Sequence, residues 1–499
     1  MTKSNYWKRI YAVILISAAA ASGQNLTTLA NFNGTDGYDA ASVLVQAING
    51  SLYGTTYLGG YLSCNGTGCG TVYEFTPDGK LISLYVFCNN TFPNCPDGAY
   101  PSDLTQASDE NFYGTTFLGG TGMGSADNVC RNESTTHGCG TVFRITPAGK
   151  LTTIYNFCSQ SNCVDGTYPA GGLIQAASGK FYGTTTLGGA STNTQYSYGT
   201  VFEITDEGTL TTLHSFDYSD GSGPGSLVQG TDGNFYGTTD QGGAYASRLH
   251  GWGGTVFKIT PSGKLTTLYS FCAQTQCPDG NGPDSLVQGT NGNFYGVTGS
   301  GGAHEAGTVF EITPQGKLTT LYSFCAVQPN CADGTIPVGV TQATDGNIYG
   351  TTGSNGANGF GTVFDITAEG VLTTLYSFDG FDGAFPGAGL LQRTNGSFYG
   401  TTTGGGANKE GTLFGLSMGL GQFVKTLPAA AKVGAEIGVL GTNLTGASSV
   451  TLNGIPAQFS VRSASLILAT IPPGATTGYL TVTTPSGMLT SNAPFYIVP

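Results

Sequence analysis

The sequence predicts an all-β protein: a seven-bladed β-propeller followed by a small β-sandwich. Three observations support this prediction. The composition, with 81 Gly, 11% aromatic and only 9% charged residues, is typical of short strands joined by tight turns. Three short strings of residues each recur seven times. A strand-like segment also precedes the first full repeat and is missing from the last one, which indicates that the repeats close into a ring.

The N-terminus and the charge restrict the compartment and the partners. Residues 1–23 predict a secretory signal peptide, because Lys3, Lys8 and Arg9 precede an apolar run at 10–21 and small residues follow. No later segment predicts a transmembrane span. The net charge of −13 argues against nucleic acid as a partner, because no basic surface could neutralise phosphates. We expect a monomeric protein that is secreted, extracellular or on the cell surface, with the periplasm as an alternative.

Each repeat predicts four strands, named A to D here. Strand A ends at a Gln that lies seven residues before the Tyr of strand B, at residues 46, 106, 175, 229, 288, 342 and 392. Strand B carries Tyr-Gly-Thr-Thr or Tyr-Gly-Val-Thr, from residues 53, 113, 182, 236, 295, 349 and 399. Strand C resembles Gly-Thr-Val-Phe, from residues 70, 140, 199, 254, 307, 361 and 411. Strand D resembles Leu-Thr-Thr-Leu-Tyr-Ser-Phe, from residues 26, 81, 151, 210, 265, 318 and 372.

The order of these strands predicts how the ring closes. The D-type segment at residues 26–32 precedes every other strand, and the last repeat has no D strand of its own. The N-terminal strand therefore completes the final blade, which leaves no exposed sheet edge, and residues 24–416 form the propeller. A parallel β-solenoid is the alternative, with shorter coils than these repeats provide.

The loops divide between two faces of the predicted propeller. Short A–B and C–D hairpins with Gly at the turn emerge on one face. The B–C and D–A loops emerge on the other face and vary in length, so we expect any ligand there.

Twelve cysteines fall into six local pairs on the variable loops. Four of the pairs lie in D–A loops, which are longer where a pair is present. The pairs are Cys64/Cys69, Cys88/Cys95, Cys130/Cys139, Cys158/Cys163, Cys272/Cys277 and Cys325/Cys331. This arrangement predicts disulfides formed in an oxidising compartment. Zinc would need four converging ligands, and the four His of the chain show no zinc-finger spacing.

The last segment changes character after residue 416. Residues 417–424 predict a linker, and residues 425–499 contain short alternating strands of the size of a small β-sandwich. The strings Gly-Thr-Asn-Leu from residue 441 and Val-Thr-Leu-Asn-Gly-Ile-Pro-Ala from residue 450 resemble the pattern of IPT/TIG immunoglobulin-like domains.

The repeats themselves resemble those of bacterial "choice-of-anchor tandem repeat GloVer-containing" proteins, through the strand B, C and D strings across residues 26–416. This resemblance implies a secreted or surface-exposed bacterial protein without an assigned activity. The repeats are more loosely similar to virginiamycin B lyase-type propellers, although no His and Glu pair recurs at matched positions. The expected fold is therefore a seven-bladed β-propeller closed by the N-terminal strand, followed by a small immunoglobulin-like β-sandwich.

Seven Asp residues, each followed by Gly, stand at equivalent positions of the D–A loops. They are Asp36, Asp97, Asp165, Asp220, Asp279, Asp333 and Asp382. As a ring on one face they are candidate ligands for Ca²⁺. Alternatively, each carboxylate caps its own turn through local hydrogen bonds. The repeat Gln residues could line the channel or satisfy buried backbone groups.

One loop cluster suggests a ligand. Arg248, His250 and Trp252 lie together in the fourth B–C loop and could stack on a sugar or contact a partner. The chain shows no catalytic residues in a known arrangement. The interpretation we favour is a secreted binding or adhesion scaffold for a glycan or protein. The alternative is an extracellular lyase or glycan-active enzyme that uses acidic residues on the same face.

Overall fold

The computed structural model of the chain describes residues 25–498 except residues 61–63, 65, 123–129, 131–137, 191–196 and 246–251. The signal peptide expected at residues 1–23 lies outside these described residues. Within them, every regular element is a β-strand apart from the short 3-10 helix η1 (Ser161–Cys163). The same part of the chain holds no helix with the length and apolar character that a membrane crossing requires.

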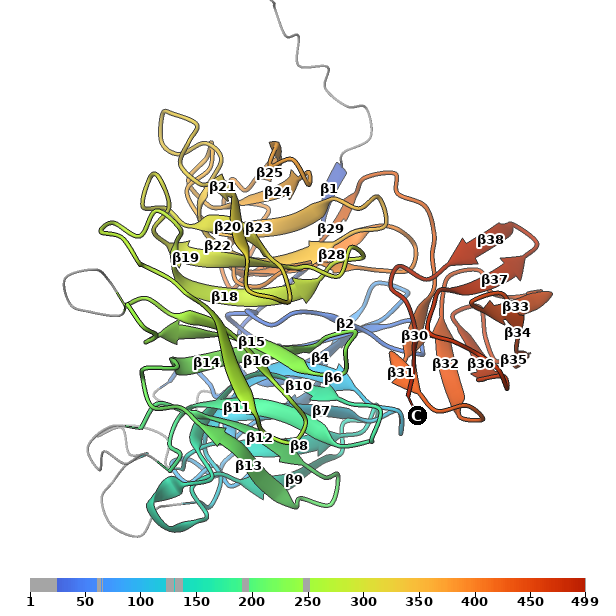
Figure 1. Cartoon of the computed structure of the whole chain (residues 1–499), viewed down its shortest axis with the longest axis horizontal. Helices are drawn as coiled ribbons and strands as arrows, with labels where there is room; N and C mark the ends of the chain where they lie inside the picture. The colour runs from blue at the N-terminus through green and yellow to red at the C-terminus, as the bar shows by residue number, and fades with distance from the viewer. Residues whose placement is uncertain are drawn as a thin grey trace, which may run out of the picture.

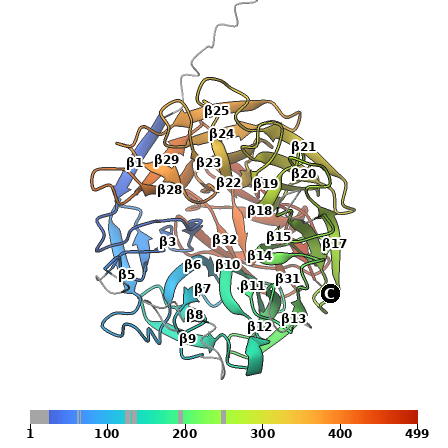
Figure 2. The same cartoon turned by 90° about the vertical axis from the view of Figure 1, so that its left-hand side faces the viewer.

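Four-stranded antiparallel sheets repeat along the chain and stand around a common centre in a propeller-like arrangement (Figures 1 and 2). Within each sheet the strands follow the predicted order A, B, C and D. The first two sheets contain β2 (Val45–Gln46), β3 (Leu52–Thr56), β4 (Thr71–Phe75) and β5 (Leu81–Val86), then β6 (Ala99–Gln106), β7 (Phe112–Leu118), β8 (Thr141–Ile145) and β9 (Leu151–Asn156). The third and fourth contain β10 (Thr167–Gln175), β11 (Phe181–Leu187), β12 (Thr200–Ile204) and β13 (Leu210–Ser215), then β14 (Ser222–Gln229), β15 (Phe235–Gln241), β16 (Thr255–Ile259) and β17 (Leu265–Ser270). The fifth and sixth contain β18 (Asn281–Gln288), β19 (Phe294–Ser300), β20 (Thr308–Ile312) and β21 (Leu318–Ser323), then β22 (Thr335–Gln342), β23 (Ile348–Ser354), β24 (Thr362–Ile366) and β25 (Leu372–Ser377).

The last of these sheets joins the two ends of the repeat region. It contains β26 (Ala384–Pro386), β27 (Leu391–Gln392), β28 (Phe398–Gly404), β29 (Thr412–Ser417) and β1 (Asn25–Asn31). Strand β1 pairs antiparallel with β29, with Leu26 opposite Leu416. Beyond β1, the buried ring of Phe32 contacts Tyr73 of the first sheet at 5.2 Å between centroids. The N-terminal segment therefore bonds to the last sheet and packs on the first.

The repeated aromatic residues form the core between neighbouring sheets. The strand B Tyr of one sheet packs against the strand B aromatic of the next, as Tyr113 does on Phe181 at 4.1 Å between ring centroids. The Phe that follows strand D packs edge-on against the strand C Phe of the next sheet, as in Phe216 on Phe257. Gly in the Tyr-Gly-Thr-Thr string makes room for that Phe, because a Cβ atom at Gly237 would lie 2.6 Å from Phe257.

The repeat Gln residues connect the A–B hairpins of neighbouring sheets. In each described link, the Gln Oε1 atom accepts a hydrogen bond from a backbone N–H of the preceding repeat. The links are Ile48 to Gln106, Ser108 to Gln175, Thr231 to Gln288, Thr290 to Gln342, Thr344 to Gln392 and Thr394 to Gln46. The last link joins the final repeat to the first, as β1 does. We call this set the glutamine belt.

The C-terminal unit is a two-sheet β-structure with its own core. One sheet is β30 (Lys425–Leu427), β32 (Glu436–Leu440), β36 (Leu466–Thr470) and β35 (Gln458–Val461). The other is β34 (Ile455–Pro456), β33 (Ser449–Leu452), β37 (Leu480–Thr484) and β38 (Gly487–Thr490), and β31 (Ala430–Ala431) pairs parallel with β39 (Tyr496–Ile497). Val439 and Ile467 of the first sheet and Val482 of the second are fully buried in one cluster.

This C-terminal unit lies against the A–B hairpins at one end of the repeat region (Figure 1). Ser465 donates a hydrogen bond to the Ile48 carbonyl, and the Thr394 and Thr442 hydroxyls are 3.0 Å apart. Phe423, at the end of the expected linker, is 2% exposed, and its backbone N–H donates to the Thr394 carbonyl. The unit is therefore docked on the repeats by contacts from the expected linker and from the unit itself.

Candidate functional site

A cavity of about 590 Å³ occupies the centre of the repeat region. Its wall comes from the strand A segments of all seven repeats, at residues 41–43, 101–103, 170–171, 225–226, 284–287, 338–341 and 387–392. Small residues dominate these segments, and they leave the centre open because short side chains do not fill it. In Figure 2 strand β32 lies behind the centre of the ring of sheets, so the C-terminal unit covers one end of this channel.

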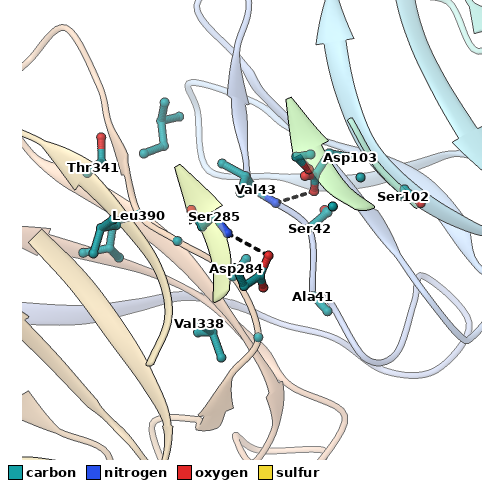
Figure 3. Close-up of a pocket in the computed structure, with 18 of the residues that line it drawn as sticks. Ala41, Ser42, Val43, Ser102, Asp103, Asp284, Ser285, Val338, Thr341 and Leu390 are labelled. Carbon is teal, nitrogen blue, oxygen red and sulfur yellow. Dashed lines mark hydrogen bonds between the residues drawn. The ribbon is translucent and has the colours of Figure 1, made fainter. Parts of the chain in front are cut away.

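Two carboxylates project from the wall of this cavity (Figure 3). Asp103 on β6 accepts a hydrogen bond from the Val43 backbone N–H at 2.8 Å, and Asp284 on β18 accepts one from Ser285 at 2.7 Å. Burial raises the pKa of Asp103 to about 6, and the negative charge of Asp284 adds to the rise. Desolvation by the surrounding wall, with the nearby charge of Asp240, also raises the pKa of Asp284. The cavity thus holds acidic groups that titrate closer to neutral pH than ordinary Asp residues.

Among the described residues that line the cavity, one is a cation, and it lies at the covered end. Lys425, the first residue of β30, lines the cavity and donates a hydrogen bond from Nζ to the Gln392 carbonyl at 2.7 Å. Burial lowers the pKa of Lys425 to about 8. The C-terminal unit therefore contributes a functional group to the cavity as well as covering it.

Two aromatic pairs lie on the B–C and D–A loop side of the repeats, the opposite end, which we call the mouth. Tyr57 lines the cavity and stacks on Tyr100 at 4.8 Å between centroids, and Phe117 stacks on Tyr168 at 5.0 Å. Tyr100 and Tyr168 have φ angles of 60° and 54°, a left-handed conformation that is uncommon for aromatic residues. Their backbone N–H groups donate to the carbonyls of Cys69 and Cys139. The cysteine loops thus hold two aromatic pairs in place at the mouth.

All six predicted cysteine pairs are disulfides in the structure, and the described residues include no free cysteine. Because the partners lie 5 to 9 residues apart, each bond closes a local loop. The disulfides belong to the B–C and D–A loops, as expected.

The seven loop Asp residues each form hydrogen bonds within their own loop. The strand D Tyr hydroxyl donates to this carboxylate in five repeats: Tyr85 to Asp97, Tyr155 to Asp165, Tyr269 to Asp279, Tyr322 to Asp333 and Tyr376 to Asp382. In the remaining two, His214 Nε2 lies 2.7 Å from Asp220, and the Asn33 backbone N–H donates to Asp36. Among the described residues, no three carboxylate or imidazole groups come within 4.8 Å of one another. The structure thus places these residues in turn-capping positions, and Ca²⁺ binding by them stays a prediction.

Of the predicted loop cluster, Arg248 and His250 lie outside the described residues. Trp252 is described and is 65% exposed on its loop.

Sequence reasoning missed Asp103 and Asp284 altogether. The signal was available: three or four residues before the repeat Gln, the other copies carry only Gly, Ala, Ser or Val, and acids occur there in two copies alone.

Comparison with curated proteins finds no match for this chain. Similar solved structures include three of low identity, each with a TM-score below 0.5. PorZ, a surface component of the type-IX secretion system of Porphyromonas gingivalis, is 12% identical with a TM-score of 0.49, covering 94% of this chain and 61% of its own. The extracellular domain of a one-component system from B. thetaiotaomicron is 12% identical with a TM-score of 0.46, covering 95% and 57%. A puromycin-hydrolyzing peptidase of Mycobacterium tuberculosis is 10% identical with a TM-score of 0.48, covering 90% and 62%.

The present chain therefore spans about three fifths of each of these three chains, and the likenesses concern the fold alone. A family model, by contrast, matches the amino-acid sequence itself over most of its length. The Gloeobacter/Verrucomicrobia repeat matches four times, over residues 15–193, 63–278, 124–331 and 253–455. These overlapping matches agree with the tandem repeats and the recurring sheets. The chain belongs to the Gloeobacter/Verrucomicrobia repeat family.

Proposed function

We propose that this protein is a secreted or surface-exposed bacterial binding scaffold that engages a glycan or a protein through the face bearing the B–C and D–A loops. One observation carries the proposal: the cavity of about 590 Å³ that runs from Tyr57 at the mouth to Lys425 at the covered end. A volume of this size suits a small ligand or the end of a chain. The disulfide-closed loops support a rigid rim around it.

The chemistry of the wall favours a glycan over a protein. Asp103 and Asp284 supply carboxylate oxygens that accept hydrogen bonds from hydroxyl groups. Tyr57 presents an aromatic surface, 37% exposed, on which the apolar face of a sugar ring can stack. The small wall residues leave space for the ligand itself.

The architecture behind this proposal is a closed seven-bladed β-propeller with an immunoglobulin-like domain of the IPT/TIG type. Pairing of β1 with β29 and the hydrogen bond between Thr394 and Gln46 support closure. The two sheets of the C-terminal unit support a sandwich. Six disulfides support an oxidising compartment, extracellular or on the surface, with the periplasm as the alternative.

A glycan array with the purified protein tests the binding proposal. We expect Tyr57→Ala and Asp103→Asn each to reduce binding at least tenfold, because stacking and a carboxylate acceptor are lost at the cavity. Trp252→Ala is the matched control on an exposed loop outside the cavity, and we expect it to retain binding. Loss of binding in Trp252→Ala with normal binding in the cavity variants would place the ligand on the loops instead.

A second candidate function is a glycan-active enzyme. The observation that favours it is the raised pKa of Asp103, about 6, beside a second carboxylate in the same cavity. A carboxyl group of that pKa can donate a proton at neutral pH while a second carboxylate acts as base. Product formation from an array-positive glycan, lost in Asp103→Asn and Asp284→Asn, would establish this activity. Binding of the glycan without formation of a product would support the binding scaffold over the enzyme.

A further inference from the structure

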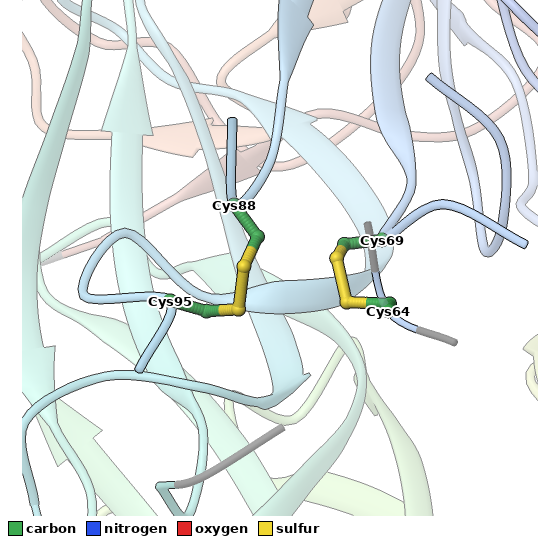
Figure 4. A group of neighbouring side chains, drawn as sticks. All are labelled: Cys64, Cys69, Cys88 and Cys95. Carbon is green, nitrogen blue, oxygen red and sulfur yellow. A yellow bond between two sulfur atoms is a disulfide. The ribbon is translucent and has the colours of Figure 1, made fainter. Parts of the chain in front are cut away.

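Two disulfides of the first repeat lie side by side although they belong to different loops (Figure 4). Cys64–Cys69 closes the loop between β3 and β4, and Cys88–Cys95 closes the loop between β5 and β6. The four Sγ atoms all lie within 4.8 Å of one another, and each of the four residues is at most 1% exposed. We call these four residues the thiol cluster. The predicted disulfides are confirmed, and the structure adds that these two bonds come together in space.

The spacing of the thiol cluster is close to that of a tetrahedral metal–thiolate site. Zinc binds thiolates at about 2.3 Å, so the four sulfur atoms of such a site stand about 3.8 Å apart. Sulfur atoms within 4.8 Å need shifts of about 1 Å to reach that arrangement, and the two bonded pairs need to separate. Opening the disulfides frees the four side chains to rotate toward that arrangement.

We propose that reduction of both disulfides converts the thiol cluster into a tetrathiolate Zn²⁺ site. Two molecules of a dithiol reductant supply four electrons and four protons, each becoming a cyclic disulfide, and the protein gains four thiols. Zn²⁺ then binds the four sulfur atoms and releases four protons to solvent. The oxidised state closes each loop separately, whereas the zinc state joins the two loops through one ion.

The site has consequences for the mouth of the channel. The Cys69 carbonyl accepts the hydrogen bond from the Tyr100 backbone N–H, and Tyr100 stacks on Tyr57. The Cys95 carbonyl accepts hydrogen bonds from the backbone of Gly98 and Gly120. Zinc at the thiol cluster would therefore keep this part of the rim ordered when the disulfides are lost.

The chain contains its own controls. In the second repeat only Cys139, Cys158 and Cys163 have sulfur atoms within 4.8 Å of one another, which is one ligand fewer. Among the described residues, Cys272–Cys277 and Cys325–Cys331 belong to no such group. A tetrathiolate site is therefore expected from the first repeat alone.

Cobalt binding tests the proposal, because Co²⁺ in a tetrahedral tetrathiolate site shows intense visible and sulfur-to-metal charge-transfer bands. The full chain is reduced with dithiothreitol, freed of reductant under argon and titrated with Co²⁺ and then with Zn²⁺. We expect one equivalent of Co²⁺ to give these bands and Zn²⁺ to displace it. The Cys130→Ser/Cys139→Ser and Cys272→Ser/Cys277→Ser variants should keep the bands, and Cys64→Ser/Cys69→Ser should lose them.

A second measurement needs no variant. With reduced wild-type protein, Zn²⁺ should slow alkylation of Cys64, Cys69, Cys88 and Cys95 at least tenfold in a mass-spectrometric assay, relative to Cys272 and Cys277. Equal protection of all cysteines, no protection, or bands that persist in Cys64→Ser/Cys69→Ser would overturn the proposal.

Discussion

The two ends of the central channel are built from different kinds of loop. At the mouth, disulfide-closed loops of variable length carry exposed aromatic residues such as Tyr57. At the covered end, short A–B hairpins are joined by the glutamine belt and are packed against the C-terminal unit. Loop length can differ between repeats at the mouth, because each cysteine-bearing loop is closed by its own disulfide. The covered end repeats the same hydrogen bond between neighbouring sheets, so it links each sheet to the next.

This difference indicates that stability depends mainly on the covered end and the ring junction, whereas recognition belongs to the mouth and the cavity wall. Changes at the covered end and at the junction should therefore lower stability, and changes in the cavity wall should alter binding.

Removal of β1 should have the largest effect. A chain that begins at Gly34 lacks the strand that pairs with β29 and the buried ring of Phe32. We expect this chain to be insoluble or to melt far below a chain that begins at Asn25, because an unpaired sheet edge and a core gap remain. Thermal unfolding by circular dichroism is the measurement. Equal melting of the two chains would show that the repeats form an open array.

Loss of the belt link at the ring junction should have the next largest effect. In Gln46→Ala the buried Thr394 N–H loses its acceptor, and we expect about 1–3 kcal/mol of destabilisation. Gln288→Ala is the matched control, because its link to Thr231 is exposed and water can replace it. Urea unfolding of both variants measures the difference. Equal losses would mean that the junction is no more critical than any other contact between sheets.

Asp103→Asn should stabilise the protein in a pH-dependent way. Because the pKa of Asp103 is raised to about 6 in the folded protein, ionisation opposes folding once the pH exceeds the unfolded value near 4. The stability of the wild type should therefore fall between about pH 4 and pH 6 relative to the variant. We expect a gain of about 1–2 kcal/mol for Asp103→Asn at pH 7 and none below pH 4.

The control for this experiment is Asp78→Asn at an exposed C–D hairpin, where a hydrogen bond and ion pair with Lys80 lower the pKa of the carboxyl. This variant should show no such gain at pH 7. A gain for Asp103→Asn that persists at pH 3.5 would reject the role of ionisation. A gain that appears only near neutral pH would show that the ionised Asp103 carboxylate destabilises the fold.

Calcium should have the smallest effect. The carboxylates of Asp220 and Asp279 already bind His214 and Tyr269 in their own loops, so millimolar Ca²⁺ should raise the melting temperature by less than about 1 °C. A larger rise that disappears in Asp220→Ala and Asp279→Ala would establish a cation site on this face. Differential scanning fluorimetry with and without EDTA measures it.

Local patterns were sufficient for much of the fold. The strings in strands B, C and D predicted sheets with the observed strand order, and all six disulfides followed from the spacing of the cysteines. These features were predictable because strand periodicity, turn glycines and short-range disulfides depend on residues that are close in the sequence. The glutamine positions were also visible as a fixed spacing from the motif Tyr, but their partners were not, because each partner lies in another repeat.

The residues that form the cavity depended on the tertiary structure. Asp103 and Asp284 belong to different repeats, and Lys425 belongs to the C-terminal unit, so no local pattern brings them together. The same holds for the thiol cluster, in which two loops converge only after the sheet between them has folded. The repeat, the strands and the local crosslinks follow from neighbouring residues, so they can be predicted from the amino-acid order. The set of carboxylates that share a cavity and have raised pKa values depends on contacts between distant repeats, because desolvation and proximity arise only when those repeats pack together.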